Sequence, residues 1–129
     1  MIVLDASVLI AHLNRDDAHH GAATARLNDV AEHEFVVSSI TLAEALVAPA
    51  RVGRTSDARA SLQAIGIEEM PLPPTAAERL AILRAETGLQ LPDCCVLLAA
   101  EDANGPIVTF DERLERAAAQ RGLAHREPD

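Results

Sequence analysis

The sequence contains no lysine, tryptophan or tyrosine, and all 11 of its basic residues are arginine. Without lysine, the chain cannot form a Schiff base or bind phosphate through a P-loop lysine. Its only phenylalanines are Phe35 and Phe110. So few aromatic rings almost exclude a platform that stacks nucleobases on aromatic side chains.

Positive charge is scarce relative to negative charge. Twenty Asp and Glu residues against 11 Arg give a net charge of −9, and the isoelectric point is near 4.9. A protein this acidic does not bind nucleic acid non-specifically through its overall electrostatic field. A role in RNA or DNA chemistry would therefore require metal ions, a local arginine patch, or both.

Cysteines and long apolar runs are rare as well. Cys94 and Cys95 are adjacent, a spacing that rarely permits a disulfide, which predicts a reducing compartment and a core-filling role for both. The longest uncharged run is nine residues, far too short to cross a membrane, and the N-terminus shows no signal-peptide pattern. We therefore expect a cytoplasmic protein with no membrane partner.

Small aliphatic residues in short runs dominate what remains. Hydrophobic residues make up 49% of the 129 positions, enough for the core of a single domain over residues 1–129. The apolar runs predict four strands and a last edge strand, at Ile2–Leu4, Phe35–Val37, Ile67–Leu72, Ile107–Val108 and Leu123–Ala124. Helical patterns lie between them, so we expect an α/β fold with a central parallel β-sheet flanked by helices on both faces.

Capping patterns predict where the helices begin. Thr41–Glu44 and Thr75–Glu78 have capping-box spacing, and Asp111 is positioned to cap the last helix. Two further N-caps are predicted, with the residue left open in each: Asp16 or Asp17, and Thr55, Ser56 or Asp57. Val96–Ala100 is apolar on every side, which predicts a buried central helix with Pro92 at its first position.

Four carboxylates fall near predicted strand ends or helix starts. Asp5 directly follows the first strand, and Asp111 closely follows the Ile107–Val108 strand. Glu44 lies early in the helix after the second strand, and Asp93 begins the buried helix. Parallel sheets bind ligands at the carboxyl ends of their strands, so these side chains can converge on one edge. Clustered carboxylates need a counterion, and a hard divalent cation that prefers oxygen ligands supplies it.

Each carboxylate also has a purely structural alternative. Asp93 could simply favour the helix dipole, Asp111 could be only an N-cap, and Glu44 could be only the acid of its capping box. Asp5 is the hardest to explain in this way, because acidic residues are depleted in strands and seldom follow a buried one. Together, the four favour a metal-dependent site for phosphodiester hydrolysis.

Four segments carry these acids in order along essentially the whole chain: residues 2–11 (IVLDASVLIA), 38–46 (SSITLAEAL), 91–93 (LPD) and 108–114 (VTFDERL). This ordered set resembles the PIN-domain ribonucleases, especially the VapC toxins of bacterial toxin–antitoxin modules. The resemblance implies a PIN-like α/β fold and endoribonuclease activity that depends on Mg²⁺ or Mn²⁺. It also implies a homodimer and inhibition by a cognate VapB-type antitoxin.

By the same resemblance, Asp5, Glu44, Asp93 and Asp111 form an acidic catalytic pocket. Asp5 and Asp93 are implied to be the main metal ligands. The other two carboxylates would complete the metal's shell or orient the attacking water. Glu112 directly follows Asp111, so the identity of the fourth acid stays open between them.

Other residues of the matching segments have supporting roles by the same resemblance. Ser7 and Thr109 match hydroxyl positions that support the carboxylates, with an ordinary strand-end hydroxyl as the alternative. The expected reaction is in-line attack of water on an RNA phosphodiester, which leaves a 5′-phosphate and a 3′-hydroxyl. The only basic stretch comprises Arg51, Arg54 and Arg59. It is a candidate RNA contact, with Arg51 and Arg54 as its main residues and a solvated turn as the alternative. The competing function is a catalytically silent PIN scaffold that acts by binding antitoxin or RNA.

Overall fold

Four short parallel strands form the centre of the computed structural model, which describes residues 1–29 and 33–124. The strands are β1 (Ile2–Leu4), β2 (Phe35–Ser38), β3 (Ile67–Met70) and β4 (Ile107–Val108). They lie in the order β3-β2-β1-β4, and every neighbouring pair is parallel. The predicted parallel sheet is confirmed. The third strand ends at Met70 rather than at Leu72, because Pro71 has no N–H group to donate to a strand ladder.

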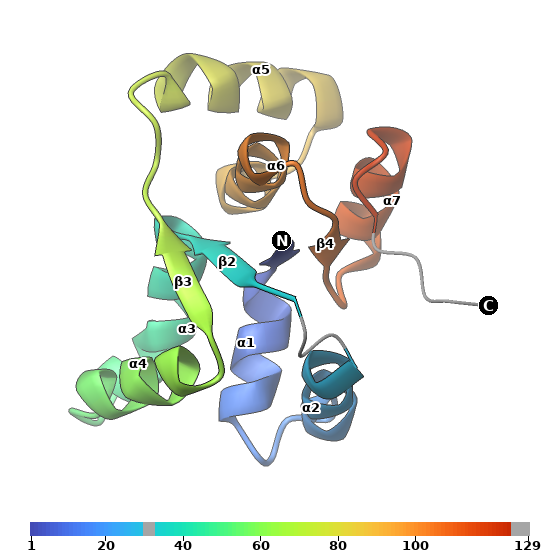
Figure 1. Cartoon of the computed structure of the whole chain (residues 1–129). Coiled ribbons are helices and arrows are strands. Elements are labelled where there is room, and N and C mark those ends of the chain that lie inside the picture. The colour runs from blue at the N-terminus through green and yellow to red at the C-terminus, as the bar shows by residue number, and fades with distance from the viewer. Residues whose placement is uncertain (30–32, 125–129) are drawn as a thin grey trace.

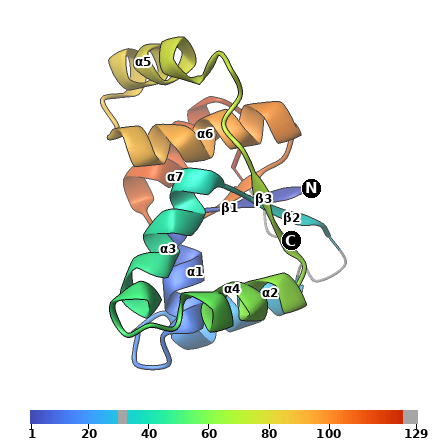
Figure 2. The same ribbon diagram turned by 90° about the vertical axis from the view of Figure 1, so that its left-hand side faces the viewer.

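Helices cover both faces of this sheet, as the α/β prediction requires. Figures 1 and 2 show α1, α2 and α4 on one side of the strands and α5 and α6 on the other. The helices within the described residues are α1 (Ala6–Leu13), α2 (His20–Asp29), α3 (Ser39–Arg51), α4 (Thr55–Ala64), α5 (Ala76–Thr87), α6 (Leu91–Ala103) and α7 (Glu112–Gln120).

Side chains alternate along the strands between two apolar cores. Ile2 and Leu4 of β1 pack into the core that includes residues of α1, α2, α3 and α4. Val3 points the other way, into the core formed with α5, α6 and α7. Every residue of β1, β2 and β4 is buried, which explains why these strands read as continuous apolar runs rather than alternating patterns.

The sixth helix is buried at its centre, as its sequence predicts. All seven residues from Cys94 to Ala100 are buried, and α6 packs on β1, β2, α3 and α5. Cys94 and Cys95 are free thiols within this stretch, which confirms their core-filling role. Burial raises the pKa of both thiols, so they remain protonated and poorly reactive near neutral pH.

The start of α3 differs from the capping-box prediction. Ser38 is the N-cap, and its hydroxyl accepts a hydrogen bond from the backbone N–H of Ile40. The helix therefore begins where β2 ends, and Thr41 is buried inside it rather than capping it. Glu44 falls in the second turn, too far along to be the acid of a capping box. Because this removes the structural alternative for Glu44, its carboxylate needs another explanation.

Two other predicted caps are also wrong in detail. Thr75 occupies the N-cap position of α5 but makes no capping hydrogen bond through its side chain. Arg54 occupies the N-cap position of α4, so Thr55, Ser56 and Asp57 all lie within the first turn. Asp57 there forms an ion pair with Arg54 at 3.3 Å. Its negative charge also interacts favourably with the positive N-terminal end of the helix dipole.

The remaining boundary predictions are met in part. The second helix, α2, begins at His20, so Asp16 and Asp17 lie too early to be its N-cap, although Asp17 accepts a hydrogen bond from the backbone N–H of His19. Pro92 is the second residue of α6 rather than the first, and Asp111 caps α7 as predicted.

The predicted edge strand at Leu123–Ala124 is reduced to one parallel bridge between Ala124 and Ile107. Beside β4, the backbone N–H of Ile107 also donates to the carbonyl of Leu123 at 2.7 Å. Within the described residues, the turn after α7 thus contributes a short contact rather than a strand. Among the described helices, none is long and apolar enough to cross a membrane.

Candidate active site

The predicted acidic residues lie at the carboxyl edge of the parallel sheet. Asp5 is the first residue after β1, and it is only 6% exposed. Thr109 follows β4, which is the neighbour of β1, and it is buried as well. Because all four strands run in the same direction, the segments that leave them enter the same region of the molecule.

Three hydrogen bonds fix the carboxylate of Asp5. One oxygen, Oδ1, accepts from the backbone N–H of Ala6 at 2.7 Å, which makes Asp5 the N-cap of α1. The other oxygen, Oδ2, accepts from the hydroxyls of Ser7 at 2.8 Å and Thr109 at 2.6 Å. A carboxylate offers about four lone-pair sites, so one remains for a further partner. These bonds confirm the supporting role implied for both hydroxyls.

The same two hydroxyls hold the loop that carries Asp111. The Ser7 hydroxyl oxygen accepts from the backbone N–H of Phe110 at 3.1 Å, and the Thr109 hydroxyl oxygen accepts from that of Asp111 at 2.9 Å. Asp111 in turn caps α7, because its Oδ1 accepts from the backbone N–H groups of Arg113 and Leu114. Asp111 is therefore both an N-cap and a neighbour of the Asp5 network.

Glu44 and Asp93 complete the cluster from α3 and α6. Burial of its carboxyl group raises the pKa of Glu44, and the charges of Asp5 and Asp93 raise it further. Burial likewise raises the pKa of Asp93, with further contributions from Asp5 and Asp111. The structure thus brings together all four acids that the sequence singled out, from four separate segments of the chain.

One arginine offsets part of this negative charge. The positive charge of Arg113, in the first turn of α7, lowers the pKa of Asp93 against the combined effect of burial and the other acids. Glu112 precedes it as the first residue of α7 and is exposed. The charges that raise the pKa of Asp93 include that of Asp111 and not that of Glu112, which favours Asp111 as the fourth acid.

The donor set suits a hard divalent cation. Its side-chain ligands would be carboxylate oxygens, and mutual repulsion among them leaves a need for positive charge. Among the described residues, no three His, Cys, Asp or Glu side chains already stand close enough to hold one ion. Mg²⁺ accepts such a site, because it keeps several water molecules and is usually bound through only one or two carboxylates.

A groove beside Glu44 contains the basic residues singled out in the sequence. It lies between α1, α3 and α4 and has a volume of about 780 Å³. Arg51 and Arg54 both line it together with Glu44, and Arg15 from the end of α1 adds a third guanidinium. The predicted basic turn is thus connected to the acidic cluster through one continuous surface.

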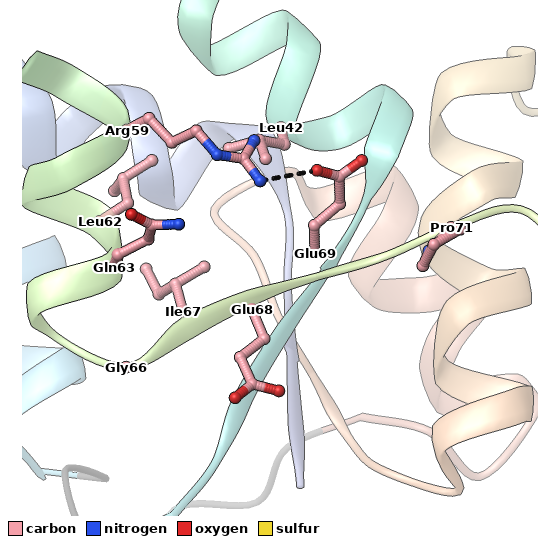
Figure 3. A pocket seen from close by; sticks show the side chains of 9 residues that line it. All are labelled: Leu42, Arg59, Leu62, Gln63, Gly66, Ile67, Glu68, Glu69 and Pro71. Atoms are coloured by element: carbon pink, nitrogen blue, oxygen red, sulfur yellow. Dashed lines mark hydrogen bonds and ion pairs between the residues drawn. The ribbon is translucent and has the colours of Figure 1, made fainter. Parts of the chain in front are cut away.

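A second hollow lies apart from the acidic cluster, beside the edge strand β3 (Figure 3). Arg59 of α4 reaches into it and pairs with Glu69 at 2.9 Å, and Glu69 also accepts a hydrogen bond from Ser39. None of the four clustered carboxylates is among the described residues that line it. Arg59 therefore lines the hollow beside β3, whereas Arg51 and Arg54 line the groove beside Glu44.

One feature next to the cluster has no signal in the sequence. The imidazole of His19, between α1 and α2, stacks on the ring of Phe110 at a centroid distance of 4.9 Å. Arg26 of α2 lies over the same phenyl ring, with its guanidinium carbon 6.0 Å from the centroid. His19 and Phe110 are far apart in the chain and belong to no common motif, so only the fold brings them together.

Comparison with known families identifies this arrangement. The family model for the PIN domain matches residues 2–120. The chain belongs to the PIN-domain family. No curated protein sequence matches this PIN domain significantly.

Solved structures with the same fold include three from bacterial toxin systems. VapC20 of Mycobacterium tuberculosis, a toxin that cleaves the sarcin–ricin loop, is 18% identical, with a TM-score of 0.75 over 99% of this chain and 100% of that one. A toxin–antitoxin complex from Klebsiella pneumoniae is 23% identical, with a TM-score of 0.72 over 86% and 87% of the two chains. VapBC2 of Rickettsia felis, bound to a fragment of its promoter DNA, is 19% identical, with a TM-score of 0.69 over 90% and 92%.

Proposed function

We propose that this PIN domain is a divalent-metal-dependent endoribonuclease and the toxin of a toxin–antitoxin module. The observation that carries the proposal is the convergence of three carboxylates on a fourth, Asp5, whose side chain is held by three hydrogen bonds. A cluster of like charges around one buried carboxylate destabilises the protein and persists where it has a chemical use. The similar structures include a toxin that cleaves the sarcin–ricin loop and two toxin–antitoxin assemblies.

In this proposal each carboxylate has a distinct task. Asp5 and Asp93 would hold the metal ion, since Asp5 keeps one lone pair available in a fixed direction and its charge acts on Asp93 in the first turn of α6. Bound Mg²⁺ or Mn²⁺ neutralises phosphate charge and lowers the pKa of water. Glu44 and Asp111 complete the ion's surroundings or orient the attacking water. The products are a 5′-phosphate and a 3′-hydroxyl.

The basic groove supplies the proposed contact with the RNA backbone. Arg51 and Arg54 line the same groove as Glu44, so a strand lying in it leads toward the acidic cluster. Each phosphate contact releases counterions, which makes affinity depend on salt. If Arg51→Ala combined with Arg54→Ala left both the RNA affinity and its salt dependence unchanged, this part of the proposal would be wrong.

The remaining parts of the proposal concern partners and cellular location. A net charge of −9 suits an antitoxin that presents basic side chains, and two of the similar structures are toxin–antitoxin assemblies. We also propose that the chain forms a homodimer, which light scattering of the purified protein tests directly. The free, buried thiols of Cys94 and Cys95 support a reducing, cytoplasmic compartment.

Cleavage of a mixed cellular RNA pool tests the central claim. Wild type and Asp93→Asn are incubated with Mg²⁺, Mn²⁺ or EDTA, and Asp102→Asn serves as the control. Asp102 lies in the last turn of the same helix, where its carboxylate pairs with Arg79 on the surface. We expect discrete metal-dependent products from wild type and Asp102→Asn, and none from Asp93→Asn.

Other outcomes of the cleavage experiment point elsewhere. Cleavage that persists in a folded Asp93→Asn protein would contradict the proposed site. A wild-type protein that binds metal and RNA and cleaves neither the pool nor purified ribosomal, transfer and messenger RNA would favour the silent scaffold. DNA substrates assayed alongside the RNA distinguish a ribonuclease from a nuclease that acts on DNA.

A further inference from the structure

We propose that His19, backed by Phe110, is a base-stacking residue that binds a nucleobase of single-stranded RNA beside the acidic cluster. This inference rests on the proposed ribonuclease function and adds a recognition element to it. The sequence almost excludes a stacking platform because it contains only two phenylalanines and no tryptophan or tyrosine. The fold supplies a platform nonetheless, because an imidazole serves as its second ring.

The two rings form a parallel stack with an outer and an inner member. Their planes meet at 17° and their centroids are 4.9 Å apart. Phe110 is partly buried and packs against the core beneath α1 and α2, whereas His19 is exposed. His19 is therefore the solvent-side ring of the pair, in the position where a third flat ring can continue the stack.

Hydrogen bonds fix the backbone that carries this outer ring. The backbone N–H of His19 donates to Asp17 Oδ1 at 2.8 Å, and its carbonyl accepts from the N–H of Ala23 at 2.8 Å. The next residue, His20, bonds through Nδ1 to the carbonyl of Ala11 at 2.8 Å. The turn between α1 and α2 is thus attached to both helices, and a preformed platform loses little conformational freedom when it binds a ligand.

The stack is also tied directly to the acidic cluster. Phe110 lies between Thr109, which donates to Asp5, and Asp111, which caps α7. Its own N–H donates to the Ser7 hydroxyl, which in turn donates to Asp5. A nucleotide whose base rests on His19 consequently has its phosphates next to the residues proposed to hold the metal.

The chemistry of the surroundings favours RNA as the occupant. Arg26 lies over the Phe110 ring, which adds a positive charge beside the stack in an otherwise acidic protein. Base–aromatic stacking needs no net charge on the protein and tolerates every base, because each base has a π-face. The net charge of −9 repels RNA through the overall electrostatic field. Base stacking supplies affinity for RNA in spite of that repulsion.

A binding experiment in the Asp93→Asn background, with Mg²⁺ present, tests the proposal without cleavage. The probes are a single-stranded oligoadenylate and an oligonucleotide of equal length and charge with abasic positions. We expect His19→Ala to weaken oligoadenylate binding about tenfold, which corresponds to about 1.4 kcal/mol, and to leave the abasic oligonucleotide unaffected. His19→Phe should retain the affinity. His33→Ala is the matched control, because His33 is exposed and lies just before β2, at the amino end of that strand, whereas the acids follow the carboxyl ends of the strands.

Fluorescence gives a second and independent readout. Because the chain has no tryptophan or tyrosine, a His19→Trp variant contains a single strong fluorophore at the proposed contact. We expect oligoadenylate to quench it and the abasic oligonucleotide to leave it unchanged, while a His33→Trp variant responds to neither. Thermal unfolding of every variant verifies that it is folded.

Several results would overturn the inference. The first is a His19→Ala variant that binds both oligonucleotides equally more weakly. The second is a folded His19→Phe variant that does not retain the affinity for oligoadenylate. The third is a His19→Trp variant whose fluorescence oligoadenylate does not quench. Metal-dependent cleavage by wild type alongside any of these results would leave the proposed function standing and remove only the stacking role. A wild-type chain that neither binds nor cleaves RNA would overturn both.

Discussion

Asp5 lies at the centre of the proposed active site. Its carboxylate accepts hydrogen bonds from one backbone N–H and two hydroxyls, so its direction is set before any ligand arrives. Preorganised charged groups of this kind need no rearrangement when a cation or a phosphate binds. Thr109 links Asp5 directly to Asp111, because its hydroxyl donates to the Asp5 carboxylate and accepts from the N–H of Asp111.

We therefore predict that Thr109→Val weakens both stability and Mn²⁺ binding. Valine has nearly the same shape and lacks the hydroxyl, which leaves Asp5 without one donor and Asp111 N–H without its acceptor. Hydrogen bonds to charged groups are worth about 1.5–3 kcal/mol, and denaturant unfolding should show a loss of that order. Isothermal titration with Mn²⁺ measures the second effect. Thr109→Ser, which keeps the hydroxyl, should restore both properties; an unaltered Thr109→Val protein would contradict the prediction.

Charge repulsion within the cluster leads to a second prediction at this scale. The folded protein raises the pKa of Asp93 above its usual value near 3.8. A carboxyl group with a raised folded-state pKa contributes stability below its unfolded pKa and loses it as pH rises through the folded one. At pH 7 the ionised Asp93 consequently destabilises the metal-free fold.

Asp93→Asn should therefore raise the melting temperature of the metal-free protein by a few degrees at pH 7. The difference should shrink as the pH falls from 7 toward the raised pKa of Asp93, because the wild-type carboxylate then becomes protonated. Thermal scans in EDTA across this pH range measure it, with Asp102→Asn as the control that shows no gain. A lower melting temperature for Asp93→Asn at neutral pH would show that Asp93 makes favourable contacts that outweigh the repulsion.

At the scale of secondary-structure elements, helix starts bring the functional groups to the sheet edge. Asp5 caps α1, Ser38 caps α3 and Asp111 caps α7. The connections between these strands and the helices that follow are short, with one residue between β1 and α1, none between β2 and α3, and three between β4 and α7. Helix N-termini also carry a partial positive charge, which stabilises the acids placed there and favours the approach of phosphate.

Asp111 combines a capping role with a proposed chemical role, and two substitutions separate them. Asparagine caps helices as well as aspartate does, whereas alanine loses about 1 kcal/mol of stability. We predict that Asp111→Asn keeps the stability of wild type and loses metal-dependent RNA cleavage, while Asp111→Ala loses both. Glu112→Gln should retain both. Unfolding curves and cleavage assays on the three variants decide between the two acids, and loss of cleavage only in Glu112→Gln would identify Glu112 as the fourth acid.

At the scale of the whole molecule, the central position of β1 makes the site possible. It pairs with β2 on one side and β4 on the other, so the N-terminal segment lies beside a strand about a hundred residues later in the chain. A close backbone approach accompanies this pairing. A Cβ atom on Gly105 would collide with the carbonyl oxygen of Met1, and neither backbone is free to move away.

Gly105→Ala should destabilise the fold by about 1–3 kcal/mol because the overlap forces the N-terminus and β4 apart. Gly21 provides the matched control, since it lies in α2 and a Cβ there meets nothing within 4 Å. Gly21→Ala should raise stability by about 0.4–1 kcal/mol through the unfolded chain. Chemical denaturation of both variants measures the contrast, and an unchanged Gly105→Ala protein would show that the two segments separate easily.

Much of the fold and the acidic cluster follows from local patterns. Buried strands of a parallel sheet appear in the sequence as uninterrupted apolar runs such as Ile2–Leu4. An acidic residue directly after such a run is conspicuous, because acidic residues are depleted in strands. The ordered motifs around Asp5, Glu44, Asp93 and Asp111 were enough to indicate a PIN domain. The structure confirms the parallel α/β fold and brings these four side chains together.

Helix boundaries and long-range ring contacts did not follow from those patterns. Thr41–Glu44 has capping-box spacing, yet Ser38 caps the helix because α3 begins at Ser39, directly after β2. The stack of His19 on Phe110 joins a turn to a strand end with no shared motif. Arg59 was grouped with Arg51 and Arg54 by proximity in sequence, and α4 turns it toward Glu69 instead.

The amino-acid sequence by itself determined which residues are buried and which carboxylates are exceptional, because burial and capping depend on hydrophobicity and on near neighbours in the chain. Only the tertiary structure decided which of those residues meet. Hydrogen bonds from Thr109 to Asp5 and ring stacking between His19 and Phe110 act over a few ångströms. They join segments about ninety to a hundred residues apart, and the strand order β3-β2-β1-β4 is the physical reason that they form.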